Sequence, residues 1–482
     1  MHVKPLLNFL GILVLVLGLS MAMPLAVSLY YGEGDAGAFL ISSAAALIPG
    51  LALFLLTRRH GRPALGHRDG VAIVTFGWIT AGLVGTLPYL ISGSIPGLTN
   101  AYFESISGFT TTGASILSEI EGLPKGILLW RSLTQWFGGM GIIVLSVAIL
   151  PFLGIGGMQL YKAEVPSPVV DKLKPRISDT AKTLWKVYVL ITFLEILLLL
   201  AGGMSLFESA CHAFATLPTG GFSPKNASIA HYDSAYFDGV VLVFMLLAGI
   251  NFSLHYRMIK GDPVSWFVDP EFRVFMGLFA FFTLTVTLDV YGSIYESVIE
   301  AFRFASFQVG SILTTTGFAT ADFDTWPAYS RLVLLLSMFL GGMAGSTGGG
   351  MKIMRVLLLV KHAYREVFRF IHPRAVTQVK LGRKTVPDEV LSSIWGFFLL
   401  FTGLFIVASF AMAALGLDLI TAFSSVAASI GNIGPGLAGV GPVRNYYDIP
   451  MAGKWILMFC MLLGRLEIYT VIVLMIPEYW KK

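Results

Sequence analysis

The chain has few charged residues and almost no cysteine for its length. Charged residues make up 13% of its 482 residues and hydrophobic residues 55%, whereas a water-soluble domain carries roughly a quarter charged residues. No stretch is polar enough for a separate soluble domain, so the composition predicts one large body in a lipid bilayer. The two cysteines, Cys211 and Cys460, make no disulfide framework, and no group of cysteines and histidines has metal-ligand spacing.

Signatures of enzymes and of nucleic-acid-binding proteins are missing as well. There is no His–Glu pair at zinc spacing, no Ser/His/Asp arrangement and no dinucleotide fingerprint, so we expect no catalytic activity and no covalent cofactor. His212 and His255 are lone histidines in apolar stretches, where packing is a simpler role than ligation. The net charge of +5 is spread along short loops rather than gathered on one face, so we expect no nucleic-acid partner.

Long apolar runs dominate what is present. A membrane-spanning helix needs about 20 mostly apolar residues. Ten segments meet this length, at 5–31, 37–57, 71–92, 127–153, 184–204, 236–256, 273–292, 327–351, 390–415 and 454–477. Four shorter apolar segments cannot cross a roughly 30 Å hydrocarbon core, and we interpret them as re-entrant half-helices. The expected fold class is therefore an all-α membrane protein with ten spans and four half-helices.

The basic residues favour one orientation in the membrane. If the N-terminus is cytoplasmic, most of the 33 Lys and Arg residues fall in cytoplasmic segments, above all in the loops at 162–186 and 352–384. The half-helices then enter from outside, and both termini are cytoplasmic. A signal peptide is the alternative for the first segment, but its apolar run at 6–31 exceeds the usual length of about 7–15 residues. We expect an uncleaved span.

One motif occurs four times, each time at the end of a half-helix. The copies are FESISGFTTTGA (103–114), CHAFATLPTGGF (211–222), FQVGSILTTTGF (307–318) and SSVAASIGNIGP (424–435). They superimpose without a gap, which aligns Gly113, Gly221, Gly317 and Gly434. A single copy would be an ordinary loop, whereas four copies indicate an ion pore made from one polypeptide. A passive membrane scaffold, the alternative, would have no use for them.

The residue types in these copies suit a cation. Backbone carbonyls can replace its hydration shell, glycine permits the backbone geometry, threonine hydroxyls add oxygen ligands, and the half-helices present their partially negative ends. The predicted filter residues are Thr110, Thr111, Thr112, Gly113, Pro218, Thr219, Gly220, Gly221, Thr314, Thr315, Thr316, Gly317, Gly431, Asn432, Ile433 and Gly434. The predicted carbonyl ligands are Thr111, Thr112, Gly220, Thr315, Thr316, Asn432 and Ile433. In the second copy, Pro218 removes one donor and predicts reduced symmetry.

A gate is predicted within the segment 341–350, which holds six glycines and cannot sustain a regular helix, since each costs up to about 1 kcal/mol relative to alanine. A Walker-type phosphate loop is ruled out because Lys352 is separated from the last glycine and is not followed by Ser or Thr. A helix-packing seam of small residues is the other interpretation. We favour an unwound loop below the filter. The expected gate residues are Gly345, Ser346, Thr347, Gly348, Gly349 and Gly350, with Arg465.

Arg465 lies deep in the last span, beside Glu467. A charge there costs at least about 2.5–3.5 kcal/mol, so the side chain should face the pore or a partner rather than lipid. A structural ion pair with Glu467 is the alternative role. Arg303, at the start of a half-helix, is expected at the outer interface.

These motifs resemble the TrkH/TrkG family of bacterial potassium uptake proteins, within the Trk/Ktr/HKT superfamily of fused four-repeat transporters. The resemblance covers essentially the whole chain. It rests on YFESISGFTTTGA (102–114), QWFGGMGIIVLSVAILPFLGIGGMQLY (135–161), GGMAGSTGGGMK (341–352), GNIGPGL (431–437) and GRLEIYT (464–470). It implies two N-terminal helices at 1–70, as in the Trk branch, and four membrane–pore-loop–membrane repeats around a central pore. The expected repeats are 71–160, 161–260, 261–375 with the gate loop at 341–352, and 376–482.

The resemblance also implies function and partners. In this superfamily a glycine in all four filters accompanies potassium selectivity, a serine in the first filter tends to admit sodium, and the arginine matching Arg465 lies near the pore. It implies K⁺ uptake across the bacterial inner membrane by a homodimer, with a TrkA-type cytosolic ring that binds ATP or NADH, since this chain has no nucleotide fingerprint of its own. We expect the ring to dock on a basic face near the gate loop, formed by Lys352, Arg355, Lys361 and Arg365.

Overall fold

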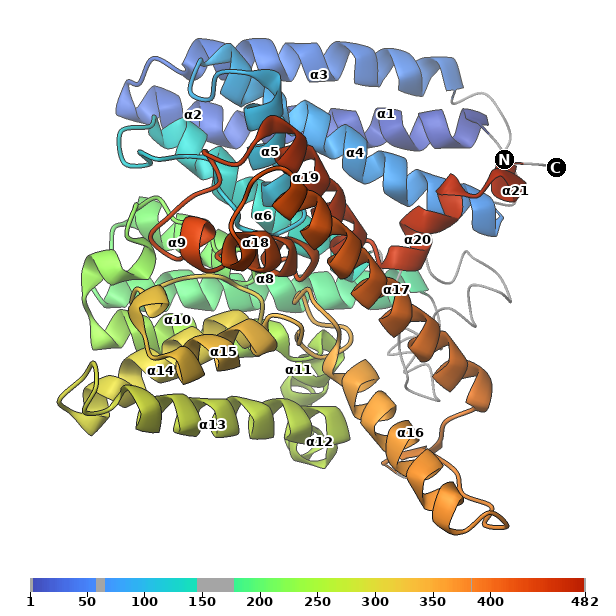
Figure 1. The fold of residues 1–482 in the computed structure, drawn as a ribbon. Coiled ribbons are helices and arrows are strands. Elements are labelled where there is room, and N and C mark those ends of the chain that lie inside the picture. The colour runs from blue at the N-terminus through green and yellow to red at the C-terminus, as the bar shows by residue number, and fades with distance from the viewer. Residues whose placement is uncertain (1–2, 58–65, 145–176, 383, 481–482) are drawn as a thin grey trace.

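The helices lie in layers and run mostly parallel or antiparallel to one direction in the computed structural model (Figure 1). The structure describes residues 3–57, 66–144, 177–382 and 384–480. Most of the loops at 58–68 and 162–186, and the end of the expected span 127–153, lie outside this part. At the N-terminus, α1 (Val3–Ser20) and α2 (Ala22–Tyr31) form one long apolar helix that packs against α3 (Ala36–Thr57).

The rest of the described chain repeats one order of elements, a long helix, a short half-helix and a second helix. The first set is α4 (His67–Ile91), α5 (Leu98–Phe109) and α6 (Lys125–Val144). The second is α8 (Ile177–Ala201), α9 (Leu206–Thr216), and α10 (Ala235–Gly249) followed by α11 (Phe252–Ile259). The third is α13 (Pro270–Val290), α14 (Val298–Leu313), and α15 (Ala328–Ser337) followed by α16 (Ile353–Ile371). The fourth is α17 (Asp388–Ala414), α18 (Leu419–Ile430), and α19 (Met451–Arg465) followed by α20 (Ile468–Ile472).

Small elements complete the described chain. The short helix α12 (Val264–Val268) precedes α13, and α21 (Pro477–Trp480) lies near the start of α1 (Figure 1). One antiparallel hairpin, β1 (Lys380–Leu381) with β2 (Lys384–Thr385), joins α16 to α17. Single turns of 3-10 helix lie at η3 (Ser228–Tyr232), η4 (Phe323–Thr325), η5 (Ala438–Val440) and η6 (Val473–Met475).

Six stretches of the described chain are long and apolar enough to cross a membrane. They are Val3–Tyr31, Ala36–Thr57, Arg68–Ile91, Thr180–Ala201, Pro270–Val290 and Asp388–Ala414. Two further candidates are bent pairs, α10 with α11 at 104° and α19 with the α20–η6 segment at 116°. The expected spans 236–256 and 454–477 are therefore broken, which their apolar composition did not predict. In the first, Asn251 interrupts the helix, because its side chain accepts a hydrogen bond from the Ser253 amide (2.8 Å) and caps α11.

The half-helices are short and enclosed by protein, as expected. α5 and α18 have 12 residues each, about 18 Å of helix at 1.5 Å per residue, which is less than the hydrocarbon core. Nearly every residue in their second halves is buried. At the start of α18, hydrogen bonds from Thr421 hold the pKa of the Asp418 carboxyl below its ordinary value, so the cap stays charged. Each half-helix thus begins near the rim and ends inside the protein.

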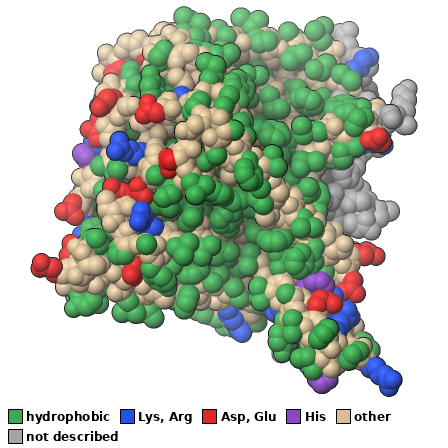
Figure 2. Space-filling model, viewed as in Figure 1, with side chains coloured by type: hydrophobic (Ala, Val, Ile, Leu, Met, Phe, Trp, Pro, Cys, Tyr) green, Lys and Arg blue, Asp and Glu red, His purple; other side chains and the backbone are tan. Residues whose placement is uncertain are grey.

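The surface matches a bilayer. Hydrophobic side chains cover the middle of the face in Figure 2, whereas charged side chains gather along its left edge and on the projecting end at lower right. Large apolar side chains of the outer helices are exposed, among them Leu19, Ile48, Phe193, Leu288 and Val407. Such a belt of apolar surface would be unfavourable in water and is expected against lipid.

Candidate ion pore

The four filter segments share one backbone conformation. The residue two before each aligned glycine has a positive φ, with values of 53° at Thr111, 57° at Thr219, 62° at Thr315 and 52° at Asn432. The glycines have positive φ as well, with 77° at Gly113, 77° at Gly221, 83° at Gly317 and 98° at Gly434. Positive φ in a β-branched residue is strained, and such strain clusters at functional sites. Three threonines strained at one repeated position therefore indicate a built site.

Each segment leaves its half-helix through the same hydrogen bond. The amide before the aligned glycine donates to the carbonyl five residues earlier, from Thr112 to Ser107 (2.9 Å), Gly220 to Ala215 (2.8 Å), Thr316 to Ser311 (2.8 Å) and Ile433 to Ala428 (2.8 Å). The reduced symmetry expected from Pro218 is wrong for the backbone. Because proline has no amide hydrogen, Pro218 lacks only the helix-end hydrogen bond that the amides of Thr110, Thr314 and Gly431 donate at the same position.

The four segments close into a ring. A Cβ atom built on each aligned glycine would overlap the carbonyl oxygen that precedes the glycine of the next segment. The pairs are Gly113 with Gly220, Gly221 with Thr316, Gly317 with Ile433, and Gly434 with Thr112, the last at 2.7 Å. These contacts run through the segments in chain order and return to the first. No side chain fits at the four glycines, so the sequence motif and the close approach explain each other.

Oxygen atoms line this ring. Hydroxyl pairs link Thr110 to Thr112 and Thr314 to Thr316, each at 2.8 Å, and the Asn432 amide donates to the Thr112 hydroxyl (3.0 Å). Within the part of the chain that the structure describes, two buried side-chain oxygens of the ring have no hydrogen-bond partner, the hydroxyl of Thr111 and the amide oxygen of Asn432. They occupy the same position in the first and fourth segments. Because buried polar atoms are normally satisfied, these two are available to water or a cation.

Side chains outside the predicted filter residues brace the ring. The Gln135 amide of α6 donates to the Gly220 carbonyl (2.7 Å) and accepts from the Phe222 amide (3.0 Å). The Arg131 guanidinium forms a buried ion pair with Glu104 (2.8 Å).

This buried pair joins two filter segments at their outer ends. Glu104 accepts from the Ile116 amide (3.0 Å), just after the first filter, and Arg131 donates to the Ser223 carbonyl (3.2 Å), just after the second. Neither Gln135 nor the Glu104–Arg131 pair was among the predicted site residues. Polar residues inside otherwise apolar segments were the available signal.

The glycine-rich segment lies directly beneath the ring. It has no helix between Gly341 and Met351, and the Gly341 amide donates to the Met351 carbonyl (3.0 Å), which brings its ends together. The Gly349 amide donates to the Thr315 hydroxyl of the third filter (2.6 Å), and the Thr347 hydroxyl donates to the Leu217 carbonyl of the second (2.8 Å). The helix-packing alternative is therefore wrong, and the loop contacts the filter itself.

The break between α10 and α11 receives this loop. In a continuous helix the Ala248 and Gly249 carbonyls would accept from amides one turn later. Here the Gly249 carbonyl accepts from the Met343 amide (2.8 Å) and that of Ala248 from the Thr347 amide (3.3 Å), while the Phe252 amide donates to Gly345 (3.0 Å). The loop thus takes over hydrogen bonds that the broken helix gives up.

Arg465 contacts the loop rather than Glu467. Its guanidinium donates to the Thr347 carbonyl (2.7 Å) and to the Gly138 carbonyl of α6 (3.1 Å), and the side chain is 3% exposed. Glu467 is bonded instead to Arg355 (2.7 Å), so the alternative of an Arg465–Glu467 ion pair is wrong. The Lys352 ammonium also donates to a loop carbonyl, that of Gly348. Two cationic groups therefore hold the loop below the ring.

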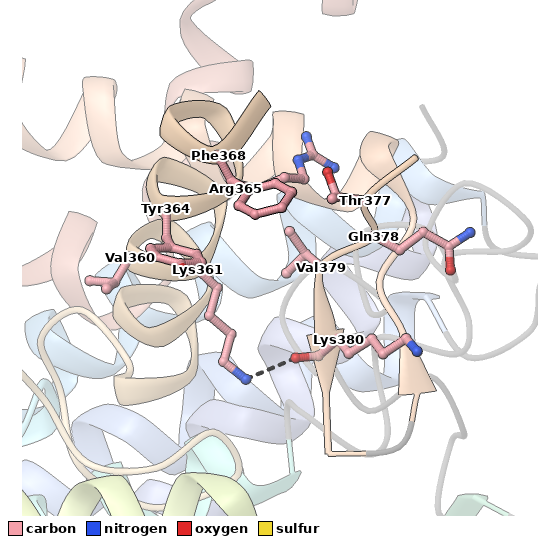
Figure 3. Close-up of a pocket in the computed structure, with 9 residues that line it drawn as sticks. All are labelled: Val360, Lys361, Tyr364, Arg365, Phe368, Thr377, Gln378, Val379 and Lys380. Atoms are coloured by element: carbon pink, nitrogen blue, oxygen red, sulfur yellow. Dashed lines mark hydrogen bonds between the residues drawn. The ribbon is translucent and has the colours of Figure 1, made fainter. Parts of the chain in front are cut away.

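The basic face expected for docking is only partly present. Arg355 and Arg365 are buried and paired, Arg355 with Glu467 and Arg365 with Asp388 (2.7 Å). Lys361 donates to the Lys380 carbonyl (2.8 Å) across a cavity of about 540 Å³ between α16 and the β1 strand (Figure 3). Arg355 and Arg365 are therefore bonded within the protein rather than free on the surface, so the expected four-residue docking face is wrong for these two residues.

The other singled-out residues have structural partners. His212 is buried and bonded to the Ser223 hydroxyl (3.1 Å), and a ring nitrogen of His255 bonds to the Leu247 carbonyl (2.8 Å). Arg303 is partly exposed and pairs with Asp238 (2.7 Å) near the rim. Cys211 and Cys460 are buried free thiols. Within the described residues, no group of His, Cys, Asp and Glu is arranged to hold a metal ion.

Comparison with known proteins agrees with this arrangement. Residues 36–482 match the TrkH family model, described as a cation transport protein. The chain is 44% identical to the Trk system potassium uptake protein TrkH of Escherichia coli K12 and 43% identical to that of Salmonella typhimurium, covering all of both chains in each case. It is 39% identical to the potassium transporter TrkH from Vibrio parahaemolyticus, whose crystal structure covers the whole chain with a TM-score of 0.91. The chain therefore belongs to the TrkH family of cation transport proteins.

Proposed function

We propose that this chain carries K⁺ inward across the bacterial inner membrane, through one pore per chain. The observation that carries the proposal is the closed ring of four filter segments, each with the same strained backbone and an aligned glycine. The predicted filter residues include no charged side chain, which suits a filter that replaces water by carbonyl dipoles. The TrkH relatives are named potassium uptake proteins, which supports K⁺ as the ion.

The ion ligands follow from the ring. We assign coordination to the backbone carbonyls of Thr111, Thr112, Gly220, Thr315, Thr316, Asn432 and Ile433. The shared conformation adds Thr219, which has the same positive φ as Thr111 and Thr315. Rubidium, close to potassium in size, is carried as well, whereas sodium is excluded.

Closure is the task of the loop at 345–350 together with Arg465. The loop contacts the second and third filters, and the Arg465 guanidinium fixes it to α6. A fixed positive charge next to the conduction path raises the energy of a passing cation. The described contacts therefore suit a closed gate.

The direct test is ion flux through the purified chain in liposomes. The proposal expects rubidium tracer uptake that external K⁺ competes away and Na⁺ does not. Liposomes with folded protein that pass no cation flux even when the gate loop is shortened would overturn it. That result would leave an intramembrane enzyme or a passive scaffold subunit as the alternative functions.

The orientation and the repeats belong to the same proposal. We place both termini in the cytoplasm, because the basic loops at 162–186 and 352–384 then face inward. We assign repeats to 71–160, 161–260, 261–375 and 376–482, after two helices at 1–70. Each contains one half-helix and one filter glycine. Labelling of single cysteines introduced at each end, in intact cells, tests the orientation.

We further propose a homodimer that binds a TrkA-type cytosolic regulator, through which ATP or NADH acts. α16 projects from the body, and its apolar side chains Val360, Tyr364, Val367 and Ile371 are exposed, which suits a protein partner (Figure 1). Because Arg355 and Arg365 are buried, we expect the regulator to contact exposed basic residues instead, such as Arg374, Lys380 and Lys384. Co-purification with the regulator, before and after charge reversal of these three residues, tests the docking.

A further inference from the structure

Glu271 lies at the base of the gate loop and accepts hydrogen bonds from backbone amides on either side of residues 345–350. It occupies the first turn of α13, and its side chain is 2% exposed. One carboxylate oxygen accepts from the Ala344 amide (2.8 Å) and from the Met354 amide (3.1 Å). Ala344 precedes the residues 345–350 and Met354 follows them. A single oxygen atom therefore joins the two ends of the loop.

This carboxylate does not cap its own helix, but through Met354 it satisfies a first-turn amide of α16, the helix that follows the loop. The start of α13 is already capped by Asp269, whose side chain accepts from the amides of Glu271 and Phe272 (2.9 and 3.0 Å). Among the described residues, Glu271 takes part in no ion pair. A buried carboxylate without a cation is costly, and here the two loop amides compensate it. Its position is thus explained by the loop rather than by its own helix.

The contacts of the loop fall into two groups. Thr347 and Gly349 reach the filter with hydrogen bonds to Leu217 and Thr315. Ala344 and Met354 fasten the base to Glu271. Glycine-rich backbone has little intrinsic preference for one shape, so the position of the upper contacts depends on how firmly the base is held.

We propose that Glu271 is the positioning residue of the gate, the anchor that keeps the loop in its closed place. The inference rests on the proposed function, in which this loop closes a K⁺ pore. Without the carboxylate, both base amides lose their acceptor and the loop no longer has a fixed base. The closed state then loses stability relative to open states, while the filter ring, which Glu271 does not touch, keeps its selectivity.

The test is single-channel recording of the purified chain in planar bilayers, without any regulatory partner. Glu271→Ala should raise the open probability by at least about tenfold, since hydrogen bonds to charged groups are the stronger class. Glu271→Gln keeps an uncharged oxygen of the same size and should give an intermediate rise. Single-channel conductance and K⁺/Na⁺ selectivity should stay at the wild-type values in both variants. A merely structural role would reduce the number of active channels without changing open probability.

A matched control lies at the other end of the same helix. Asp289 also accepts two hydrogen bonds, from the amide (3.1 Å) and the hydroxyl (2.6 Å) of Ser330. It lies near the C-terminal end of α13, roughly 27 Å along the helix axis from Glu271 at 1.5 Å per residue. Asp289→Ala should therefore leave the open probability unchanged. If Glu271→Ala does not fold, the comparison of Glu271→Gln with Asp289→Asn carries the test.

A variant with a shortened loop separates this inference from the proposed function. If shortening 345–350 raises the open probability but folded Glu271→Ala behaves as wild type, Glu271 does not anchor the loop, whereas the proposal that the loop is the gate is unaffected. If neither change alters the open probability, the loop is not the gate. An equal rise in open probability in Asp289→Ala and Glu271→Ala would also contradict the proposed anchoring role of Glu271, since the effect would then not be specific to the loop.

Discussion

Replacing Gly113 with serine should let sodium pass through the ring. Gly113 has a φ of 77°, which costs an L-residue roughly 1–2 kcal/mol. The new Cβ would also overlap the Gly220 carbonyl oxygen, which is a backbone atom and can move only if the second filter moves. If about 1–3 kcal/mol of this strain is relieved by displacing the carbonyl, the free-energy preference of the ring for K⁺ over Na⁺ falls by the same amount. The K⁺/Na⁺ permeability ratio should then fall by about 5- to 150-fold.

The measurement is the reversal potential of the purified variant with K⁺ on one side of a bilayer and Na⁺ on the other. Gly93→Ser is the matched control. Gly93 has a φ of 72°, but a Cβ atom there would meet nothing within 4 Å. It carries the same backbone strain without a filter carbonyl nearby, so its selectivity should match wild type. Unchanged sodium exclusion in folded Gly113→Ser would show that the close approach of Gly113 to the Gly220 carbonyl does not set selectivity.

Three further changes have defined outcomes. Deleting two or three of the glycines in 345–350 should raise flux, and an unaltered rate in a folded variant would contradict a gating loop. Arg465→Ala should raise flux by at least about tenfold. Each guanidinium hydrogen bond contributes about 1.5–3 kcal/mol, and about 1.4 kcal/mol corresponds to a tenfold change. A tracer flux equal to that of wild type would show that Arg465 is not part of the gate. Gln135→Leu leaves the Gly220 carbonyl and the Phe222 amide unpaired, so thermal melting should show a loss of about 1–3 kcal/mol, and a melting curve like that of wild type would argue against the brace.

The sequence was sufficient for the parts of the pore that repeat. Four aligned copies predicted the four half-helices, and the alignment at Gly113 and Gly434 matches the positive φ and the close approach found there. Six glycines in 341–350 predicted the unwound segment because glycine content is a local property that needs no partner. Local signals of this kind are read reliably from one sequence.

The partners of single polar side chains could not be predicted in this way. Arg465 and Thr347 are 118 residues apart, and Glu467, two residues from Arg465, bonds to Arg355 instead. The break at Asn251 lies in an apolar run and is stabilised by a hydrogen bond from the Phe252 amide to the carbonyl of the distant Gly345. Long-range packing decides these choices, so proximity in sequence suggested the wrong pair.

In our proposal, four segments of one chain form a single K⁺-selective ring. The most direct measurement is the reversal potential of the purified wild-type chain in a planar bilayer, with equal concentrations of K⁺ on one side and Na⁺ on the other. We expect cation currents through single pores and a reversal potential displaced far from zero, in the direction that marks K⁺ as the permeant ion. A reversal potential near zero, or folded protein that passes no cation current with its gate loop shortened, would contradict it.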